Sequence, residues 1–224
     1  MRVVIFGASG MLGQGVLREC LHASDVTQVL SIVRAPTGAS NPKLTERVHA
    51  DLLDYRAIEA DLKALDACYY CLGVSAAGLD EAQYTRVTYD IALAAGQTLA
   101  RLNQHLIFVY VSGQGTDSTE RGRIMWARVK GRTENALRAL SFKACYAFRP
   151  GFIRPLHGAR SRTRTYRILY AVLAPVTPLL RALFPNQVLT TEVIGRAMLN
   201  VTRYGAAQPI LGAREINAAA TRRD

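Results

Sequence analysis

Three glycines near the start of the chain, Gly7, Gly10 and Gly13, have the spacing of a phosphate-binding turn. They follow an apolar run at 3–6 and precede a helical pattern, which is the order that a dinucleotide site needs. Gly7 permits a tight turn, Gly10 lets the backbone approach a pyrophosphate, and Gly13 lets the helix pack on the strand. Free N–H groups at the start of the helix attract the phosphates. The predicted cofactor contacts here are Gly7, Ser9, Gly10, Met11, Leu12 and Gly13.

Two further segments suit the adenosine half of such a cofactor. Arg34 follows the apolar stretch 28–33, where an NAD-specific site usually carries an acid, and an arginine there favours the 2′-phosphate of NADP. The alternative is an exposed loop arginine. Asp51 and Leu52 end the next strand candidate, where the carboxylate can accept from the adenine amino group while the leucine packs on the ring. Asp51 is also suited to capping a helix that starts near Asp54.

Small and hydroxylated residues end the next two strand candidates. Leu72 and Gly73 leave room for the cofactor's backbone, and Ser112 brings a hydroxyl to the nicotinamide end. The ordinary alternative for Ser112 is a serine that bonds a loop amide. Cys68 and Cys71 form a C-x-x-C pair, but residues three apart on a strand point to opposite faces. We therefore predict core cysteines and no metal site.

These residues are positioned by alternating strand and helix patterns. Strands are expected at Arg2 to Phe6, Gln28 to Val33, Arg47 to His49, Ala67 to Cys71, Leu106 to Val111 and Ala144 to Phe148. Helices are expected at Met11 to Leu21, Tyr55 to Leu65, Glu81 to Leu102 and Ala127 to Leu140. This alternation predicts an α/β fold, a doubly wound parallel sheet of the Rossmann type, with ligands at the carboxyl ends of the strands.

The pattern changes after Pro150. A loop is expected over Gly151 to Arg162, followed by a largely apolar segment from Thr163 to Phe184. A helix (Thr190 to Arg203), a short strand (Pro209 to Leu211) and a last helical turn (Glu215 to Ala220) then complete the chain. We interpret residues 1–224 as one domain, with a cofactor-binding core over 1–150 and a small substrate-side lobe over 151–224.

Composition narrows the class of protein. Half of the residues are hydrophobic, which argues against a disordered chain. No apolar leader precedes the first strand, so a cytoplasmic location is expected. The net charge of +11 is concentrated in the C-terminal half, because no acidic residue lies between Glu134 and Glu192. The basic stretch lacks interleaved aromatic residues or a recognition-helix pattern, so we expect no nucleic-acid partner.

The combination of the glycine turn with Asp51-Leu52, Cys71-Leu72-Gly73, Ser112 and Val129-Lys130-Gly131 resembles the short-chain dehydrogenase/reductase superfamily. It is most similar to the atypical, epimerase/dehydratase-like branch that includes Tat-interacting-protein-like proteins, which the segment Phe148-Arg149-Pro150-Gly151 also matches. The resemblance covers residues 1 to 155 well and the remainder loosely. It implies NADP(H) as cofactor, a cofactor contact at Pro150, and a catalytic serine and lysine at Ser112 and Lys130, with Lys130 also holding the nicotinamide ribose.

The sequence departs from the family at the catalytic tyrosine, four residues before the lysine, where it has Trp126. An indole N–H donates a hydrogen bond but is no acid or base near neutral pH, whereas the family's tyrosine exchanges a proton with the substrate oxygen. Replacement by Tyr84, Tyr89 or Tyr110 is disfavoured, and so is rescue by a histidine; only His157 is placed near a substrate cleft.

Two functions stay open on this basis. One is an oxidoreductase acting on an unknown small carbonyl-type substrate with a non-standard active site. The other is a catalytically lapsed NADP(H)-binding regulatory or scaffold protein. The arginines before the apolar run 168–174 suit contact with an anionic membrane, although a helix packed over the cleft is favoured. A homodimer formed through the long helices is left open.

Overall fold

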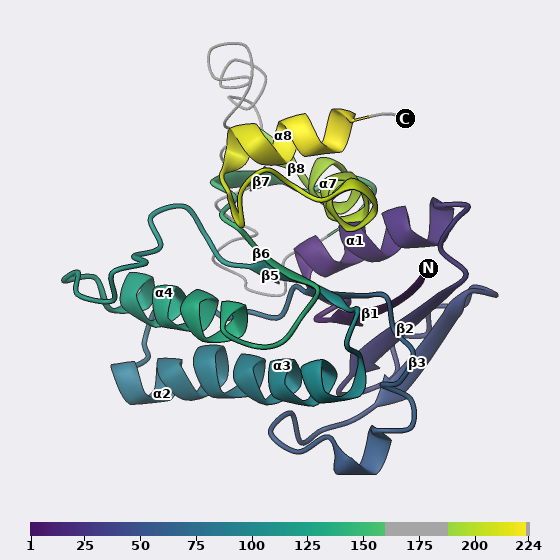
Figure 1. Ribbon diagram of the computed structural model, residues 1–224, viewed down its shortest axis with the longest axis horizontal. Coiled ribbons are helices and arrows are strands. Elements are labelled where there is room, and N and C mark those ends of the chain that lie inside the picture. The colour runs from purple at the N-terminus through teal and green to yellow at the C-terminus, as the bar shows by residue number, and fades with distance from the viewer. Residues whose placement is uncertain (160–187, 223–224) are drawn as a thin grey trace.

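The computed structural model describes residues 1–159 and 188–222. Seven parallel strands form its main sheet, in the order β3-β2-β1-β4-β5-β6-β9 (Figure 1). This order confirms the predicted doubly wound α/β fold, in which the chain reverses direction across the sheet beside the first strand. The strands are β1 (Arg2–Phe6), β2 (Gln28–Val33), β3 (Leu44–Val48), β4 (Ala67–Tyr70), β5 (Ile107–Val111), β6 (Ala144–Phe148) and β9 (Ile210–Leu211).

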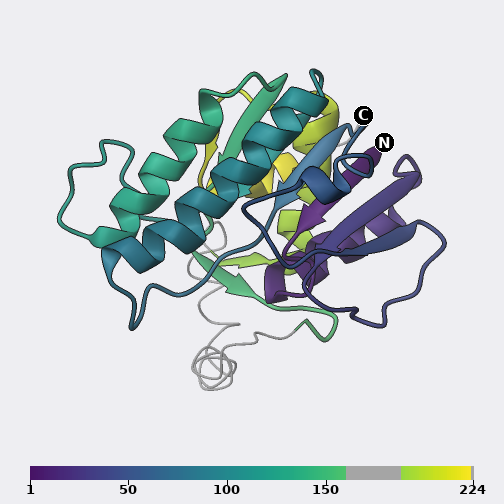
Figure 2. The same cartoon turned by 90° about the horizontal axis from the view of Figure 1, so that it is seen from below.

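Helices cover both faces of this sheet, which is why its central strands are predominantly apolar. One face carries α1 (Met11–His22), α7 (Thr191–Tyr204) and α8 (Ala213–Thr221). The other carries a long helical stretch and α4 (Met125–Arg138), which lie side by side in Figure 2. The predicted opposite orientation of the C-x-x-C pair is confirmed. Cys68 of β4 packs in the cluster that includes Leu137 of α4, and Cys71, directly after β4, packs against the cluster that includes α1.

The predicted helix from Glu81 to Leu102 forms over its full range, but its hydrogen bonding changes inside it. It consists of α2 (Glu81–Thr85), a π-helical segment (Arg86–Asp90) and α3 (Ile91–Leu102). Asp80 caps its start by accepting from the backbone N–H of Gln83 at 2.8 Å. The π segment turns Tyr89 toward α4, where the guanidinium of Arg132 lies 4.3 Å from the ring centroid.

The prediction of a helix from Tyr55 to Leu65 is wrong. Only Arg56–Ile58 is helical, as a 3-10 turn, and turns follow it. The apolar spacing was real, since Tyr55, Ile58, Leu62 and Leu65 are buried in the core. The buried side chain of Asn103 binds the end of this segment: it accepts from the Leu65 N–H, which a helix would have directed to the Asp61 carbonyl, and donates to the Leu62 carbonyl.

Part of the predicted loop from Gly151 to Arg162 is also a strand. β7 (Phe152–Arg154) pairs in parallel with β8 (Val188–Thr190) in a small second sheet. β8 leads directly into α7, whose first turn is capped by the Thr190 hydroxyl. The predicted apolar segment from Thr163 to Phe184 and most of the basic stretch before it lie outside the described residues, and with them both alternatives for that stretch, a helix over the cleft and a membrane contact.

Helices α1 and α7 cross in close contact because both carry glycine at the crossing. A side-chain Cβ at Gly15 would lie 2.5 Å from the Cβ of Thr191, and one at Gly195 would lie 2.8 Å from Cγ of Glu19. Glu19 is buried and forms ion pairs with Arg18 and Arg196. Helix α7 thereby fixes the helix that follows the glycine turn.

Candidate functional site

The glycine turn has the geometry that its sequence predicts. Gly7 has φ +81°, and a Cβ there would lie 2.7 Å from the backbone nitrogen of Leu72. A Cβ at Gly13 would overlap the Gly7 carbonyl oxygen and lie 2.7 Å from its carbon. Gly7 is therefore required by its conformation and by β4, and Gly13 by the contact of α1 with the turn.

The start of α1 is open to a ligand. Gly10 is its N-cap, no side chain caps the first turn, and that turn contains no acid. A Cβ at Gly10 would meet only the Gly7 oxygen, at 3.2 Å, so the space outside the turn is clear. Met11, Leu12 and Gly13 thus begin a helix whose first N–H groups have no side-chain acceptor, which is a cradle that suits a pyrophosphate.

The three residues predicted for the adenosine half follow β2 and β3, the two strands on one side of β1. Arg34 directly follows β2, the neighbour of β1, and is exposed; within the described ranges its guanidinium has no hydrogen-bond or ion-pair partner. Asp51 accepts from the Leu53 N–H at 3.0 Å in a tight turn, so it caps no helix. Leu52 is half-buried against the core beneath it.

Leu72 and Gly73 continue from β4 past the glycine turn. Leu72 contacts Gly7 through its backbone, whereas a Cβ at Gly73 would meet no atom within 4 Å. The strand end is therefore packed on one side and open on the other. This is the arrangement expected where a cofactor's backbone passes.

Ser112 and Lys130 come together at the end of β5. The Lys130 ammonium donates to the Ser112 carbonyl at 3.1 Å, and the Ser112 hydroxyl is hydrogen-bonded to that of Thr116 at 2.8 Å. The Ser112 N–H donates to the Phe148 carbonyl, and the Pro150 carbonyl accepts from the Gln114 N–H. Pro150 therefore anchors the loop that follows Ser112.

Helix α4 is held against this loop by a glycine and by an arginine. A Cβ at Gly131 would lie 2.6 Å from the carbonyl carbon of Asp117, so any side chain there would push Lys130 away from Ser112. Arg128 bonds the Gly122 carbonyl and the Glu81 carboxylate, which joins α4 to both the loop and α2.

The surroundings of Lys130 disfavour its charge. Burial lowers the pKa of Lys130 to about 8, against the smaller opposing effect of Glu134 one helical turn away. The ammonium lies 5.9 Å from the ring centroid of Tyr110. Both carboxylate oxygens of Glu134 are occupied by Arg149, with Oε1 3.0 Å from Nε and Oε2 2.6 Å from Nη2.

Trp126 lies beside the same loop. Its indole ring edge lies 3.4 Å from the position of a Cβ on Gly115, three residues after Ser112. Tyr110 is buried in the core and hydrogen-bonded to Thr133, and burial raises its pKa further above the ordinary range. Tyr84 is buried too, while Tyr89 stacks on Arg132. His157, considered from the sequence, is instead bonded to Glu192 of α7 at 2.8 Å.

Three residues of the site were missed by the sequence analysis. Thr116 supports the Ser112 hydroxyl, and the buried pair Glu134–Arg149 lies beside Lys130. The spacing of Glu134 four residues after Lys130 signals a helical neighbour, but no pattern in the sequence shows that Arg149 takes both of its oxygens.

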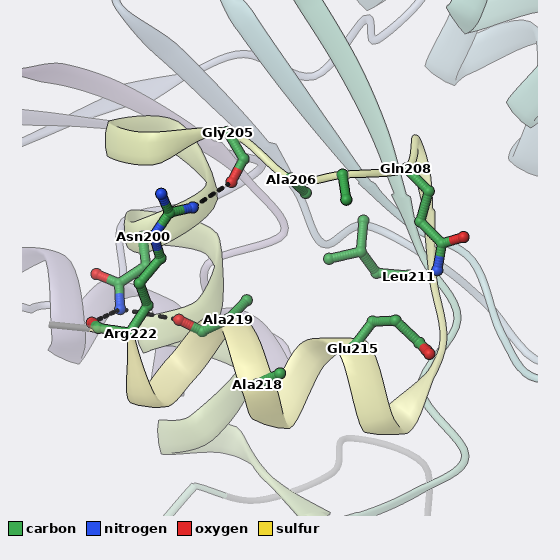
Figure 3. A pocket seen from close by; sticks show the side chains of 10 residues that line it. Asn200, Gly205, Ala206, Gln208, Leu211, Glu215, Ala218, Ala219 and Arg222 are labelled. Carbon is green, nitrogen blue, oxygen red and sulfur yellow. Dashed lines mark hydrogen bonds between the residues drawn. The ribbon is translucent and has the colours of Figure 1, made fainter.

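A separate pocket of about 270 Å³ lies between α7 and α8 (Figure 3). It is at the amino-terminal edge of the sheet, since the loop that lines it leads into β9, and so it is remote from the glycine turn. Its polar groups bond one another, because Asn200 donates to the Ala219 and Arg222 carbonyls. No group of three or more possible metal ligands occurs in the described part of the chain.

Curated relatives of this chain are fungal. It is 27% identical over 209 residues to protein fmp52, mitochondrial, of Emericella nidulans, which covers 88% of this chain and 85% of the relative. It is 27% identical over 169 residues to protein FMP52, mitochondrial, of Saccharomyces cerevisiae, covering 73% and 69%. The predicted cytoplasmic location is therefore not confirmed. Within residues 1–159 and 188–222, every helix is too short or too polar to span a bilayer.

Solved structures share the fold at low identity. Gre2 of Candida albicans, in complex with NADPH, has a TM-score of 0.71 at 12% identity, over 95% of this chain and 77% of that one. The PhqB reductase domain of Penicillium fellutanum has a TM-score of 0.67 at 18% identity; this chain spans 66% of its length.

The family assignment comes from the segment that holds the turn, Arg34, Asp51 and Ser112. Residues 3–115 match the family model described as NAD dependent epimerase/dehydratase family. NAD(P) binding is expected for that family, and the cradle at Gly7, Gly10 and Gly13 fits it. The chain belongs to the NAD-dependent epimerase/dehydratase family.

Proposed function

We propose that this protein is an NADP(H)-dependent oxidoreductase that acts on a small carbonyl compound. The observation that carries the proposal is the contact of Lys130 with Ser112, at the carboxyl edge of the sheet that also carries the glycine cradle. When bound, the cofactor supplies a hydride to the carbonyl carbon or accepts one from the alcohol. Ser112 orients the substrate oxygen through its hydroxyl, which gives up its bond to Thr116 to do so, because the Thr116 proton is donated to the Gly113 carbonyl.

The choice of NADP(H) rests on Arg34. Its exposed guanidinium follows β2 beside the glycine turn, where it can pair with a 2′-phosphate. We expect Arg34→Ala to weaken NADPH binding roughly 10- to 100-fold, the value of one charge-assisted hydrogen bond, and to leave NADH binding unchanged. Titration of both nucleotides tests this. Arg214→Ala, which removes an exposed arginine on α8, is the matched control. Equal loss for both nucleotides would contradict the assignment.

Turnover tests the proposed reaction itself. We expect the purified protein to consume NADPH with small aldehydes or ketones, and Ser112→Ala to slow this roughly 100- to 1,000-fold through loss of a donor to the substrate oxygen. Thr116→Val, which removes only the hydroxyl that supports Ser112, should have a smaller effect. If the protein consumes no NADPH with any of these aldehydes and ketones, the proposed oxidoreductase function is wrong.

The second candidate function is an NADP(H)-binding regulatory or scaffold protein without chemistry, and Trp126 is the observation that favours it. An indole at this position cannot take part in proton transfer. If the wild-type protein is inactive and the Trp126→Tyr variant gains reductase activity, the second candidate function is supported. We also propose that the chain belongs to the Tat-interacting-protein-like branch and that it is cytoplasmic. The names of the fungal relatives, which are mitochondrial, point to a different location.

A further inference from the structure

Lys130 is half-buried beside an acid that forms no ion pair with it. Glu134 lies four residues further along α4, the spacing at which a lysine and a glutamate normally pair on a helix. Arg149, which enters from the end of β6, binds both Glu134 oxygens instead, at 3.0 and 2.6 Å. The Glu134 side chain has no exposed surface, so water offers it no other partner.

The Arg149 guanidinium is itself fixed in place. Its Nη2 also donates to the Ser118 hydroxyl at 2.5 Å, in the loop between Ser112 and α4. Three elements therefore meet at this ion pair: the end of β6, helix α4 and the loop. A planar guanidinium with two parallel bonds to a carboxylate holds its partner far more rigidly than an ammonium does.

The remaining neighbours of Lys130 supply no counter-ion. Its ammonium donates to the Ser112 carbonyl at 3.1 Å and faces the ring of Tyr110 at 5.9 Å. The Tyr110 hydroxyl is bonded to Thr133, and Tyr84 lies close enough to raise the pKa of Tyr110 further. In the described residues no carboxylate is within ion-pair distance of Lys130, and burial accordingly lowers its pKa to about 8.

We propose that Lys130 is the proton donor of this site, and that Arg149 is a positioning residue that keeps Glu134 from pairing with it. The inference rests on the proposed oxidoreductase function. As the carbonyl carbon gains its new C–H bond, the carbonyl electron pair moves to oxygen. That oxygen takes a proton from the Lys130 ammonium, and the N–H bond that breaks leaves a neutral amine. Water then returns a proton to the amine.

This assignment resolves the absence of a phenol at position 126. Trp126 lies by the Ser112 loop but has no exchangeable proton near neutral pH, and Tyr110 and Tyr84 are buried on the core side. Lys130 contacts Ser112 and keeps two further N–H groups for a substrate oxygen or an intervening water. An ammonium that titrates near working pH is an efficient acid.

The test is a direct titration of Lys130. The chain has four lysines, Lys43, Lys63, Lys130 and Lys143, so protein labelled with ¹³C-lysine gives four resolvable sets of side-chain signals. Lys130→Arg assigns the Lys130 signal by its disappearance. We expect that signal to titrate with a midpoint near 8 in the full-length protein without cofactor. A midpoint near the ordinary 10.5 would overturn the proposal.

Variants of the ion pair should move this midpoint in opposite directions. Arg149→Gln frees Glu134 to pair with Lys130 and should raise the midpoint by roughly one to three pH units. Glu134→Gln keeps an acceptor for Arg149 but removes the negative charge, and should lower the midpoint. Arg149→Lys keeps a cation beside Glu134 and should leave it near the wild-type value. Unchanged midpoints in folded Arg149→Gln and Glu134→Gln would contradict the role of Arg149.

Activity provides the second readout. Reduction needs the ammonium, so turnover should fall as the pH rises through about 8, and Arg149→Gln should shift this fall to higher pH. Lys130→Met should abolish turnover while NADPH binding survives in weakened form. A Lys130 midpoint near 8 in a protein that consumes no NADPH would overturn the proton-donor role together with the proposed function. Turnover that persists in Lys130→Met would overturn the proton-donor role alone.

Discussion

A Gly13→Ala variant is expected to lose both NADPH binding and much of its stability. The added Cβ would overlap the Gly7 carbonyl and lie 2.8 Å from the Ala8 Cα. These are main-chain atoms, so only a shift of the backbone could relieve the contact. Overpacking costs about 1–3 kcal/mol where side chains can adjust, and this contact should reach about 3 kcal/mol. The better helix propensity of alanine returns only about 1 kcal/mol. Urea unfolding and NADPH titration measure the two effects.

Gly10→Ala separates binding from folding at the same turn. Its Cβ would meet a single atom, at 3.2 Å, so we expect the unfolding midpoint to change little. The same methyl group would occupy the space through which a pyrophosphate approaches α1, so NADPH binding should fall steeply. If Gly13→Ala folded as well as Gly10→Ala does, the close packing of α1 on the turn would be refuted.

The second large effect is expected from Arg149→Met. Removing one partner of a buried ion pair typically costs 3–5 kcal/mol, because the remaining charge stays buried without compensation. Lys130 can turn toward the freed Glu134 carboxylate, so we expect the lower end of that range, roughly 3 kcal/mol. Chemical denaturation of the variant at neutral pH, compared with the wild type, measures this loss.

A double-mutant cycle identifies the cause of that loss. Glu134→Leu combined with Arg149→Met removes both charges, and this double variant should recover most of the stability lost in Arg149→Met. Additive losses would instead mean that the two side chains act independently. The outcome bears on the active site, because this pair lies beside Lys130.

The sequence predicted the fold and the geometry of the glycine turn well, for a physical reason. Central strands of a parallel sheet are buried on both faces, so β1, β2 and β5 appear in the sequence as predominantly apolar runs, interrupted inside β2 by Ser31. The roles of Gly7 and Gly13 are also local, because both follow from contacts within a few residues of the turn or with the adjacent strand. Features of this kind can be predicted because the residues that determine them lie close together in the sequence.

The failures involve partners that are distant in the sequence. The apolar spacing at 55–65 indicated a helix, but Asn103, about forty residues later, binds the backbone of that segment. Likewise, Lys130 was predicted from its motif, whereas its missing counter-ion depends on Arg149 from the next strand. Strands β7 and β8 pair although their residues are more than thirty positions apart, and no local sequence pattern predicts this pairing.

The crossing of α1 and α7 has a consequence for how the chain is made. Val16 and Cys20 of α1 are buried against a face that residues 191–204 complete, and Gly15 and Gly195 admit no substitute for that contact. On the ribosome the phosphate-binding turn emerges well before its supporting helix, because α7 lies far downstream of it in the sequence. The turn and α1 therefore lack this support until residues 191–204 have been synthesised, and until then the apolar face of α1 is exposed.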